Sequence, residues 1–370
     1  MIKFLVYVAI ILTGLAIGYL VRVFELASSL KGKKPEEITE KDNRLQSRLM
    51  LTFLIVFFAF VIWNLKSFIP RMLPVAASEH GVTLDWLFNF NMAILFFVFT
   101  ITHIFLFYFA YKYYGRKNNT ATYLAHDNKL EMIWTVIPAI VLAIIIIFGL
   151  KSWNKITDNA DPNSMVVEIY AKQFDWTARY SGADNKLGES NYKLITATNE
   201  LGMDSTSAEG QDDIIVKQEI HLPVGKEVEF KFHSRDVIHS AYFPHFRAQM
   251  NVVPGMTTMF HFTPTITTAD MRKNPEVIKQ MHDINVIRAK RTAIIGNGHN
   301  DFNPGDDKPV DFDYILLCNK ICGNSHYNMQ MRVVIDSEED YKKWIASKKP
   351  YYAKADPAAA KPVAENKENK

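Results

Sequence analysis

Four long apolar segments near the start of the chain constrain its fold more than any other feature. A helix needs about 20 apolar residues to cross the hydrocarbon core of a bilayer, and each segment approaches or meets that length. Their isoleucine and phenylalanine content is too dense for a soluble helix with one polar face. We therefore expect membrane helices at residues 4–20, 50–65, 92–111 and 132–150.

The charges of the connecting loops predict the orientation of these helices. Lysine and arginine are frequent in the loops after the first and third segments, whereas the loop between the second and third offers only Lys66 and Arg71. Positively charged loops face the cytoplasm, so both chain ends are expected on the outer side of a bacterial inner membrane. The first segment could instead be a signal peptide, but no convincing cleavage motif precedes Arg22, which favours a retained helix.

Short runs of alternating polar and apolar residues replace the long apolar segments beyond Trp153. Period-two alternation indicates half-buried strands. Several short strands without a long helical repeat favour a sandwich or a Greek-key barrel. The expected strands are 165–170, 214–217, 227–232, 257–262, 314–317 and 331–335.

These patterns predict a membrane part, a β-domain and a tail. Residues 1–24 and 49–66 are two extra membrane helices around a basic cytoplasmic loop, 25–48, and residues 90–151 form a two-helix membrane hairpin. The β-domain is 152–348, with insertions near 181–213 and 265–309, the second of which contains a short helix. The tail, 349–370, is rich in alanine, lysine, proline and glutamate and has almost nothing to bury, so it is expected to be disordered.

The composition excludes several classes of protein. The formal net charge of +3, without a patch of lysines, arginines and interleaved aromatics, does not indicate nucleic-acid binding. Only two cysteines are present, four residues apart, so a disulfide scaffold is excluded. The motif Cys-x-x-Cys-His is absent, which argues against a c-type heme attached to this chain.

One loop between two predicted strands gathers metal ligands: Cys318-Asn-Lys-Ile-Cys322-Gly-Asn-Ser-His326-Tyr-Asn-Met329. Thiolate, imidazole and thioether together favour copper over hard cations such as magnesium. Two thiolates this close can both bridge a pair of copper ions, and each ion then needs a terminal imidazole. His326 supplies one imidazole, and His239 is the main candidate for the other, with His245 as its rival.

Two weaker ligands complete the hypothesis. Met329 would bind one copper ion axially, and the backbone carbonyl of Lys320 could do the same for the other. Two alternatives use the same cysteines. They could form a disulfide in an oxidising compartment, or they could bind zinc, although such zinc sites usually have two further ligands of the same class nearby.

Three patches of this sequence resemble cytochrome c oxidase subunit II, over roughly residues 91–348. The family motif Cys-x-Glu-x-Cys-Gly-x-x-His-x-x-Met matches residues 318–329, except for Lys320. Asp236-Val-Ile-His239 is similar to the family's Asp-Val-x-His, and residues 130–138, Leu-Glu-Met-Ile-Trp-Thr-Val-Ile-Pro, resemble its second-helix signature.

The resemblance implies a cupredoxin-like Greek-key barrel that is anchored in the membrane and holds a two-copper centre, called copper A. In the family, cytochrome c reduces this centre, and electrons pass to heme in subunit I, where oxygen is reduced and protons are pumped. Subunit III and membrane lipid are further expected partners, and a quinol-oxidising complex is a possible one. The chain itself holds no oxygen-reducing site.

Lys320 and Phe174 depart from the family pattern. The family's glutamate binds a magnesium ion through its carboxylate, whereas the Lys320 ammonium has no acceptor lone pair, so a magnesium ion is not expected here. The family's Gln-Trp-x-Trp is replaced by Gln173-Phe174-Asp175-Trp176. Phe174 thus stands where the family receives electrons from cytochrome c, and Trp176 either shares that role or packs.

Two roles can explain the presence of Glu131. A carboxylate at the start of the fourth apolar segment is stabilised by the helix dipole. The resemblance implies a second role, the uptake of protons into a channel of subunit I.

Three other functions share some of these features. The quinol oxidase subunit II has the same barrel but lacks the copper ligands, which are all present here. A stand-alone, membrane-anchored copper electron carrier remains the main alternative, although a simple anchor would not need the signature at 130–138. A purely structural domain with a disulfide is the third, and the spectrum of a bound copper pair would exclude it.

Overall fold

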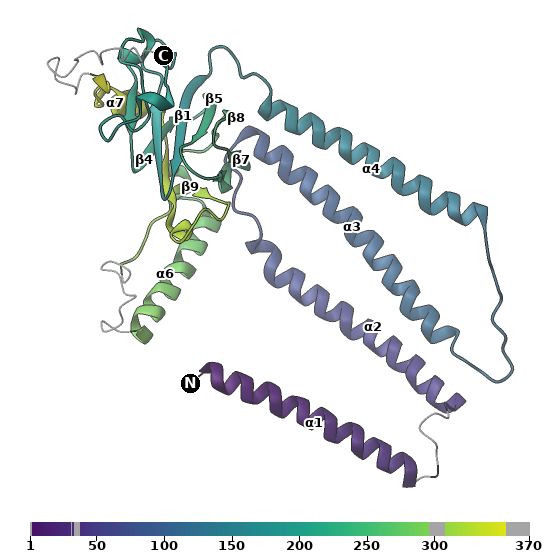
Figure 1. Cartoon of the computed structure of the whole chain (residues 1–370). Coiled ribbons are helices and arrows are strands. Elements are labelled where there is room, and N and C mark those ends of the chain that lie inside the picture. The colour runs from purple at the N-terminus through teal and green to yellow at the C-terminus, as the bar shows by residue number, and fades with distance from the viewer. Residues whose placement is uncertain (1, 31, 33–37, 296–307, 353–370) are drawn as a thin grey trace, which may run out of the picture. The chain divides into compact units, whose positions relative to one another are not determined.

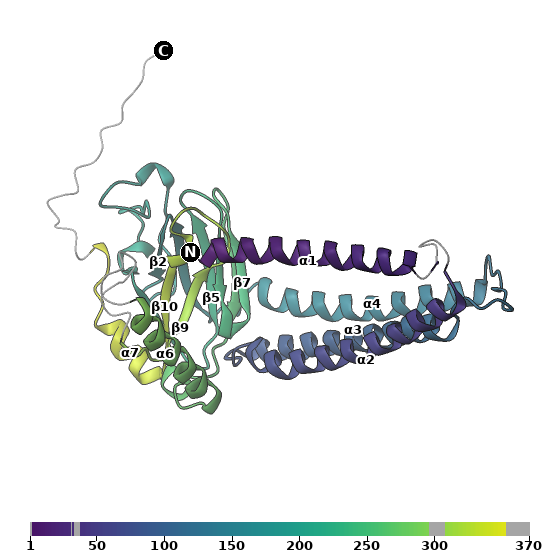
Figure 2. The same ribbon diagram turned by 90° about the horizontal axis from the view of Figure 1, so that it is seen from below.

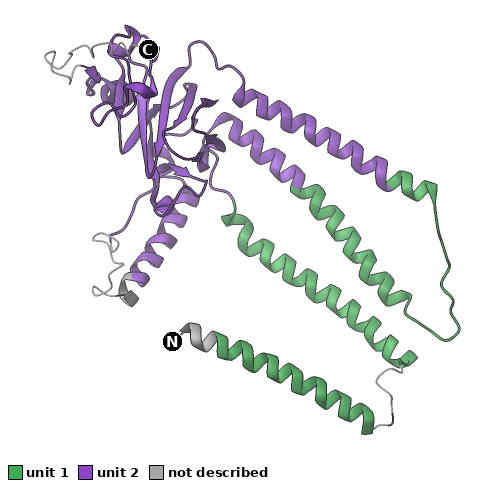
Figure 3. Ribbon diagram, in the orientation of Figure 1, with its two compact units in different colours: residues 1–72, 92–133 green, residues 73–91, 134–370 purple. Residues whose placement is uncertain are grey.

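The computed structural model describes all residues except 1, 31, 33–37, 296–307 and 353–370 (Figure 1). The described chain divides into two compact units, shown in different colours in Figure 3: residues 1–72 with 92–133, and residues 73–91 with 134–370. Four helices of the described chain are long and apolar enough to cross a membrane: α1 (Ile2–Leu30), α2 (Glu40–Phe68), α3 (Glu79–Lys112) and α4 (Asn128–Thr157).

Each helix extends beyond the apolar segment that predicted it, because the helical backbone continues into polar flanks that the apolar pattern does not include. The start of α2 shows how such a flank is stabilised. The Thr39 hydroxyl accepts a hydrogen bond from the Asp42 amide (3.3 Å), and the Asp42 carboxylate accepts one from the Thr39 amide (3.0 Å). This reciprocal cap satisfies amides that have no partner within the helix.

Aromatic rings join α2 to α3 within the first unit, and the two helices run along each other in Figures 1 and 2. The rings of Phe53 and Phe107 have centroids 5.2 Å apart, and Phe57 stacks on His103 at 5.6 Å. The imidazole of His103 also lies 2.8 Å from the Phe99 carbonyl of its own helix, so this polar ring is paired within the apolar part of α3.

Two five-stranded sheets form the β-domain. The first has the order β3 (Ile214–Val216), β2 (Asp175–Tyr180), β1 (Met165–Lys172), β5 (Val228–Ser234), β8 (Thr258–Phe262). The second has the order β4 (Glu219–Pro223), β10 (Gln330–Asp336), β9 (Tyr314–Cys318), β6 (His239–Phe243), β7 (Ala248–Val252). Within these sheets, β1 pairs with β5 and β10 with β4 in parallel, and the other pairings are antiparallel.

The predicted fold class, membrane helices followed by a β-domain, is confirmed. All six expected strands are present, and β2, β4, β6 and β7 are additional to them. A cluster of buried phenylalanines fills the core, with ring centroids of 5.2 Å for Phe230–Phe243 and 4.9 Å for Phe232–Phe260. This packed core gives the loops at the strand ends a rigid base.

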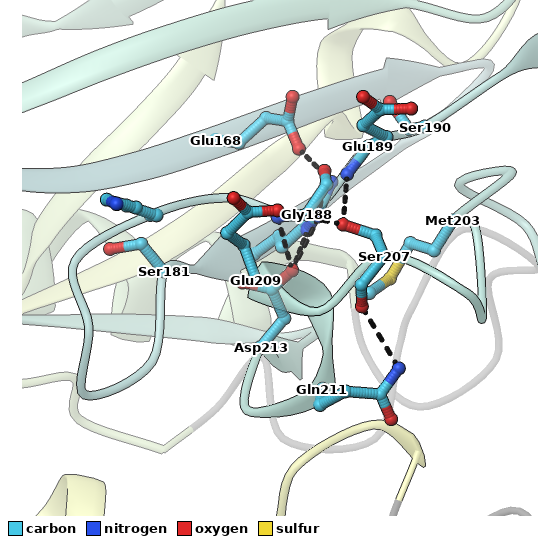
Figure 4. A network of polar contacts seen from close by, with 12 residues as sticks. Glu168, Ser181, Gly188, Glu189, Ser190, Met203, Ser207, Glu209, Gln211 and Asp213 are labelled. Atoms are coloured by element: carbon cyan, nitrogen blue, oxygen red, sulfur yellow. Dashed lines mark hydrogen bonds and ion pairs between the residues drawn. The ribbon is translucent and has the colours of Figure 1, made fainter.

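The insertion at 181–213 is attached to the first sheet through the buried guanidinium of Arg179. That group donates to Glu168 (3.0 Å), to Asp213 (3.0 and 2.5 Å) and to the Gly188 carbonyl (2.5 Å). Figure 4 shows the network, in which the Gly188 amide also donates to Asp213 at 3.0 Å. Arg179 and Asp213 are fully buried, so these charges stabilise the domain only as a paired set.

The second insertion contains α5 (Thr268–Met271) and α6 (Pro275–Ile295), and in Figure 1 α6 extends away from the end of the strands near β9. A last helix, α7 (Glu338–Ala346), was not predicted. The expectation of disorder from 349 is wrong for Tyr351, whose amide donates to the Asp213 carbonyl at 2.7 Å and whose hydroxyl donates to Thr198 at 2.6 Å. Residues 353–370 of the predicted tail lie outside the described residues.

Candidate metal centre

The ends of two neighbouring strands bring the predicted ligands together. His239 is the first residue of β6 and Cys318 the last residue of β9. The strands pair with Ala241 opposite Cys318, and the Asn319 amide donates to the Ser240 carbonyl at 2.9 Å. This register places the start of β6 beside the end of β9, although the two residues are 79 positions apart.

The loop that follows β9 returns to its own starting point. The Cys318 amide donates to the Met329 carbonyl at 3.0 Å, which closes the loop where β10 begins. Gly323 has φ +143°, a conformation that side chains rarely adopt, and a Cβ there would lie 2.8 Å from the ring of Phe174. Glycine therefore lets the loop pass directly against that aromatic ring.

Six potential donor atoms converge in this loop. The Cys318 Sγ lies 3.8 Å from the Cys322 Sγ, 3.8 Å from the His239 Nδ1 and 3.2 Å from the Lys320 carbonyl oxygen. The Cys322 Sγ lies 3.6 Å from the His326 Nδ1 and 3.7 Å from the Met329 Sδ. The structure thus brings together all six predicted metal-binding positions.

Four of the six ligand residues are shielded from solvent, whereas His326 is half-buried and Lys320 is exposed. His239 is fully buried, and Cys318, Cys322 and Met329 are 8%, 6% and 1% exposed. Burial, together with the neighbouring thiol of Cys318, raises the pKa of Cys322 to about 11. With this pKa the Cys322 sulfur is protonated at neutral pH in the absence of a cation, so metal binding there has to release a proton.

Asp236 orients the imidazole of His239. Its Oδ1 lies 2.8 Å from the Nε2 of His239, which leaves Nδ1 facing the sulfurs. Burial raises the pKa of Asp236, but hydrogen bonds from His239 and from the amides of Gln173 and Val237 outweigh it and lower that pKa. A carboxylate that holds the outer nitrogen of an imidazole is the usual support of a histidine ligand.

Gln173 is a supporting residue that the sequence did not predict. Its amide donates to Asp236 at 2.6 Å, and its side chain donates to the Cys322 carbonyl at 2.5 Å. Gln173 therefore links the carboxylate behind His239 to the cysteine loop. The sequence feature that points to Gln173 is its position directly before Phe174, at the start of the pattern that resembles Gln-Trp-x-Trp.

The arrangement argues against the two alternative uses of the cysteines. A disulfide requires sulfurs about 2.05 Å apart, whereas these lie 3.8 Å apart as free thiols. A structural zinc ion takes four ligands in a tetrahedron, fewer than the six donors that converge here. A single tetrahedral zinc ion would leave two of these donors unused.

His245, the rival for the second imidazole, lies after the other end of β6, in the turn Pro244–Phe246. Its ring packs edge-on against Phe312 (5.0 Å) and Tyr314 (5.3 Å). Burial lowers the pKa of His245 to about 4. Among the described residues, the one group of three histidine, cysteine or acidic side chains whose ligand atoms lie within 4.8 Å of one another contains His239.

The predicted electron and proton entrances differ in exposure. Trp176 is fully buried, with its Nε1 3.4 Å from the Met329 carbonyl and its ring 6.1 Å from that of His239, so it packs behind the centre and has no surface for a donor. Phe174 is half-buried against Gly323. Glu131 lies in the first turn of α4, half-exposed, 3.7 Å from the Nδ1 of His126.

The comparisons with known proteins concern both parts of the chain. A family model described as cytochrome c oxidase subunit II, transmembrane domain, matches residues 69–152. This match includes α3 and most of α4, whereas α1 and α2 precede it.

Relatives extend the similarity over most of the chain. The alternative cytochrome c oxidase subunit 2 of Bradyrhizobium diazoefficiens is 29% identical over 303 residues, which cover 81% of this chain and 92% of the relative. The cytochrome c oxidase subunit 2 of Thermostichus vulcanus is 22% identical over 299 residues, 74% and 77% of the two chains.

One solved structure with local likeness is the periplasmic domain of subunit II of cytochrome oxidase from Bradyrhizobium japonicum. It is 16% identical, with a TM-score of 0.27, and the match covers 51% of this chain and 94% of that domain. The family model and the relatives in sequence agree with each other. Together they support the assignment of this chain as a subunit II of a cytochrome c oxidase.

Proposed function

We propose that this chain receives electrons from a cytochrome c, or from a cytochrome c domain, and passes them to heme in subunit I of a respiratory oxidase. The observation that carries this proposal is the convergence of two thiols, two imidazoles, a thioether and a backbone carbonyl, five of them from the cysteine loop and one from the start of β6. Copper held by these residues would supply a reversible one-electron carrier, and the packed strands would keep the ligand side chains nearly fixed as its charge changes. Oxygen reduction and proton pumping would take place outside this chain.

The residues that would hold copper are His239, Cys318, Cys322, His326 and Met329, with the carbonyl of Lys320. The protein's contribution is rigidity, because strands β6 and β9 hold two of these ligands and Asp236 fixes one imidazole. Such outer contacts set the affinity and the potential of a metal centre.

Lys320, which replaces the glutamate of the family motif, suggests that the surroundings of this centre differ from those in the family. Its carbonyl points to Cys318, while its side chain is exposed and cationic. A lysine provides no acceptor for a cation. We therefore propose that no magnesium or manganese ion is bound next to Lys320.

Metal analysis combined with electron paramagnetic resonance (EPR) of the purified complex tests both statements. A copper pair in this loop gives a multi-line EPR pattern and strong visible absorption, with two copper ions bound by this chain. Absence of that pattern in a copper-replete preparation would contradict the electron-transfer function. Stoichiometric magnesium or manganese next to Lys320 would contradict the second statement alone.

Glu131 is proposed to deliver protons from the cytoplasmic side to subunit I. If Glu131 faces the cytoplasm, the β-domain lies on the outer side of a bacterial inner membrane. The lysine- and arginine-rich loops after the first and third apolar segments favour the same orientation. Replacement Glu131→Gln removes the titrating group but keeps the shape, so proton-coupled heme reduction should slow. Turnover at the wild-type rate would leave Glu131 only a stabilising role at the start of α4.

The stand-alone copper carrier is the second candidate. One observation disfavours it: the family match at 69–152 lies in the membrane part, where a simple anchor would need no family sequence. Purification in mild detergent distinguishes the two, because an oxidase subunit co-purifies with heme in stoichiometric amount.

A further inference from the structure

The arginine after strand β6 makes an unusual set of contacts. The Arg247 guanidinium donates to both carboxylate oxygens of Asp85 on α3, at 2.7 and 2.9 Å. It also donates to the carbonyls of Pro244 (2.7 Å) and Pro74 (2.5 Å). The Arg247 side chain is only 10% exposed, so this is a nearly buried, two-pronged pair between segments 162 residues apart.

Backbone hydrogen bonds extend the same attachment. The Ala77 amide donates to His245 at 2.7 Å, the Glu79 amide to Thr263 at 3.2 Å, and the Thr265 amide to Ala77 at 2.9 Å. The fully buried Ser78 hydroxyl donates to the Phe246 carbonyl at 2.7 Å. We call Arg247, Asp85 and these contacts of residues 77–79 the helix clamp.

The backbone of the clamp is shaped around Arg247. Its φ is +53°, a left-handed conformation that favours glycine and disfavours a long side chain, so the side chain must supply the stabilisation. Opposite it, a Cβ on Gly81 would lie 3.3 Å from the Arg247 Cγ, so a glycine there gives the arginine stem room beside α3. Asp85 lies beyond the first turn of α3, so its role is not to cap that helix.

The clamp and the metal centre lie at opposite ends of one short strand. His239 begins β6, and Phe243, which ends it, is followed directly by the turn Pro244–Phe246 and Arg247. Five residues of strand span only about 15 Å. Pairing with β7 on one side and β9 on the other keeps this strand rigid.

The β-domain has a second, covalent connection to the membrane part, since α4 ends at Thr157 and β1 begins at Met165. One flexible connection would leave the domain free to turn about it. The clamp adds an attachment to the first turns of α3, so the domain is held at two places.

We propose that the helix clamp sets the distance between the metal centre and the start of α3, with Arg247 as a positioning residue for electron transfer out of the centre. This inference rests on the proposed electron-transfer function. The rate of electron transfer falls steeply with distance, so a loosened clamp slows the step toward subunit I. The step from the donor to the centre is independent of the clamp.

The test uses the assembled complex with Arg247→Met, which keeps the apolar stem but removes the charge. Amides of Ala77, Glu79 and Thr265 should exchange with deuterium about tenfold faster or more, because charge-assisted hydrogen bonds are lost. The copper EPR signal and the rate of reduction by the donor should stay unchanged, while transfer from the centre to heme falls several-fold. Arg247→Lys should change both the amide exchange and the transfer rate less than Arg247→Met does. A lysine keeps the positive charge but cannot bind both carboxylate oxygens of Asp85 in the way that a guanidinium does.

Arg272→Met is the matched control, because Arg272 also binds a carboxylate (Asp313, 2.8 Å) and a carbonyl (Phe312, 2.8 Å) but makes no contact with α3. Asp85→Asn is the second variant, in case Arg247→Met does not assemble. Unchanged exchange at the three amides, or an unchanged transfer rate to heme, would overturn the inference. Loss of the copper signal in the variants would also overturn it, whereas its absence in the wild-type complex would contradict the proposed function instead.

Discussion

The metal loop, residues 318–329, and the insertion, residues 181–213, are both irregular segments on the same β-sandwich, but different interactions hold them. The insertion is held by the Arg179 guanidinium of β2, which is bonded to two carboxylates and a carbonyl, so positive and negative groups meet. In the metal loop, thiols, imidazoles and a thioether face one another, and all of them are groups that offer lone pairs to a metal ion. A cluster of opposite charges satisfies its own members, whereas a cluster made of lone-pair donors indicates a site for a cation.

The replacement Cys322→Ser tests this contrast most directly and is expected to have the largest effect on metal binding. A hydroxyl is a poor bridging ligand for copper, so the multi-line EPR pattern and the visible absorption should disappear, and oxidase turnover with them. Thermal unfolding of the metal-free chain should change little, because the loop backbone is closed by its own hydrogen bonds. Asn324→Ser, in the same loop, is the control and should keep the signal; a copper pair retained in Cys322→Ser would break the comparison.

The next effect concerns stability. Arg179→Met removes the cation between two buried carboxylates, which should lower the free energy of unfolding by about 3–5 kcal/mol. Weaker partners remain, His233 for Glu168 (2.9 Å) and the Gly188 amide for Asp213 (3.0 Å). Thermal unfolding in detergent, followed by tryptophan fluorescence, measures the loss, and the copper EPR signal of the folded protein should be unaffected. Combining Arg179→Met with Glu168→Leu and Asp213→Leu should restore much of the stability; an undiminished stability of the single variant would show that the network is not required.

A smaller effect is expected at the edge of the metal loop. Phe174→Leu removes the aromatic ring that contacts Gly323, so reduction by cytochrome c should slow several-fold while the copper spectrum stays intact. Stopped-flow reduction of the centre measures the rate. Tyr192→Leu, an exposed aromatic of the insertion, is the control. A rate equal to the wild type would remove Phe174 from the electron route.

The smallest effect depends on pH. Hydrogen bonds from Lys217 and Lys172 hold the pKa of Glu200 at about 2, against 4.5 for an ordinary glutamate. A carboxyl whose pKa is depressed by folding stabilises the protein above its unfolded value, and this contribution is lost as the pH falls from about 5 to 2. Glu200→Gln should therefore lower the thermal midpoint slightly at pH 7, and the difference should vanish near pH 2.

Glu189→Gln, in the same insertion, is the control for that series. Ion pairs near the surface contribute only about 0–1 kcal/mol, so the shift at pH 7 should be small. A difference in thermal midpoint between the wild type and Glu200→Gln that grows as the pH falls would contradict this explanation.

The sequence predicted the metal loop well because its ligands lie within twelve consecutive residues, where spacing alone reveals them. His239 was predicted from Asp236-Val-Ile-His239, and the structure adds the reason for its neighbour, since Asp236 binds the outer nitrogen. Strand β2 was missed because Arg179 and Thr177 are buried there despite their polarity, which hides the apolar alternation. Strands β6 and β7 contain mixed small, polar and aromatic residues, and no periodic pattern identifies them.

The helix clamp is the clearest case of what the sequence does not predict. Arg247 and Asp85 are ordinary charged residues in unrelated segments, and only the fold shows that they pair. The same holds for Arg179, whose partners Glu168 and Asp213 lie on β1 and in front of β3. Long-range pairs of this kind depend on strand order and register, which local patterns do not determine.

The register of β6 against β9 has a consequence for the order of folding. His239 and Cys318 meet only after a chain of 79 residues has closed on itself, a slow, non-local event compared with forming a turn or a helix. A slip of one residue would send the donors of one strand to the opposite face of the sheet. The donor atoms of the candidate metal centre therefore come together only in a chain in which this pairing is finished and correct.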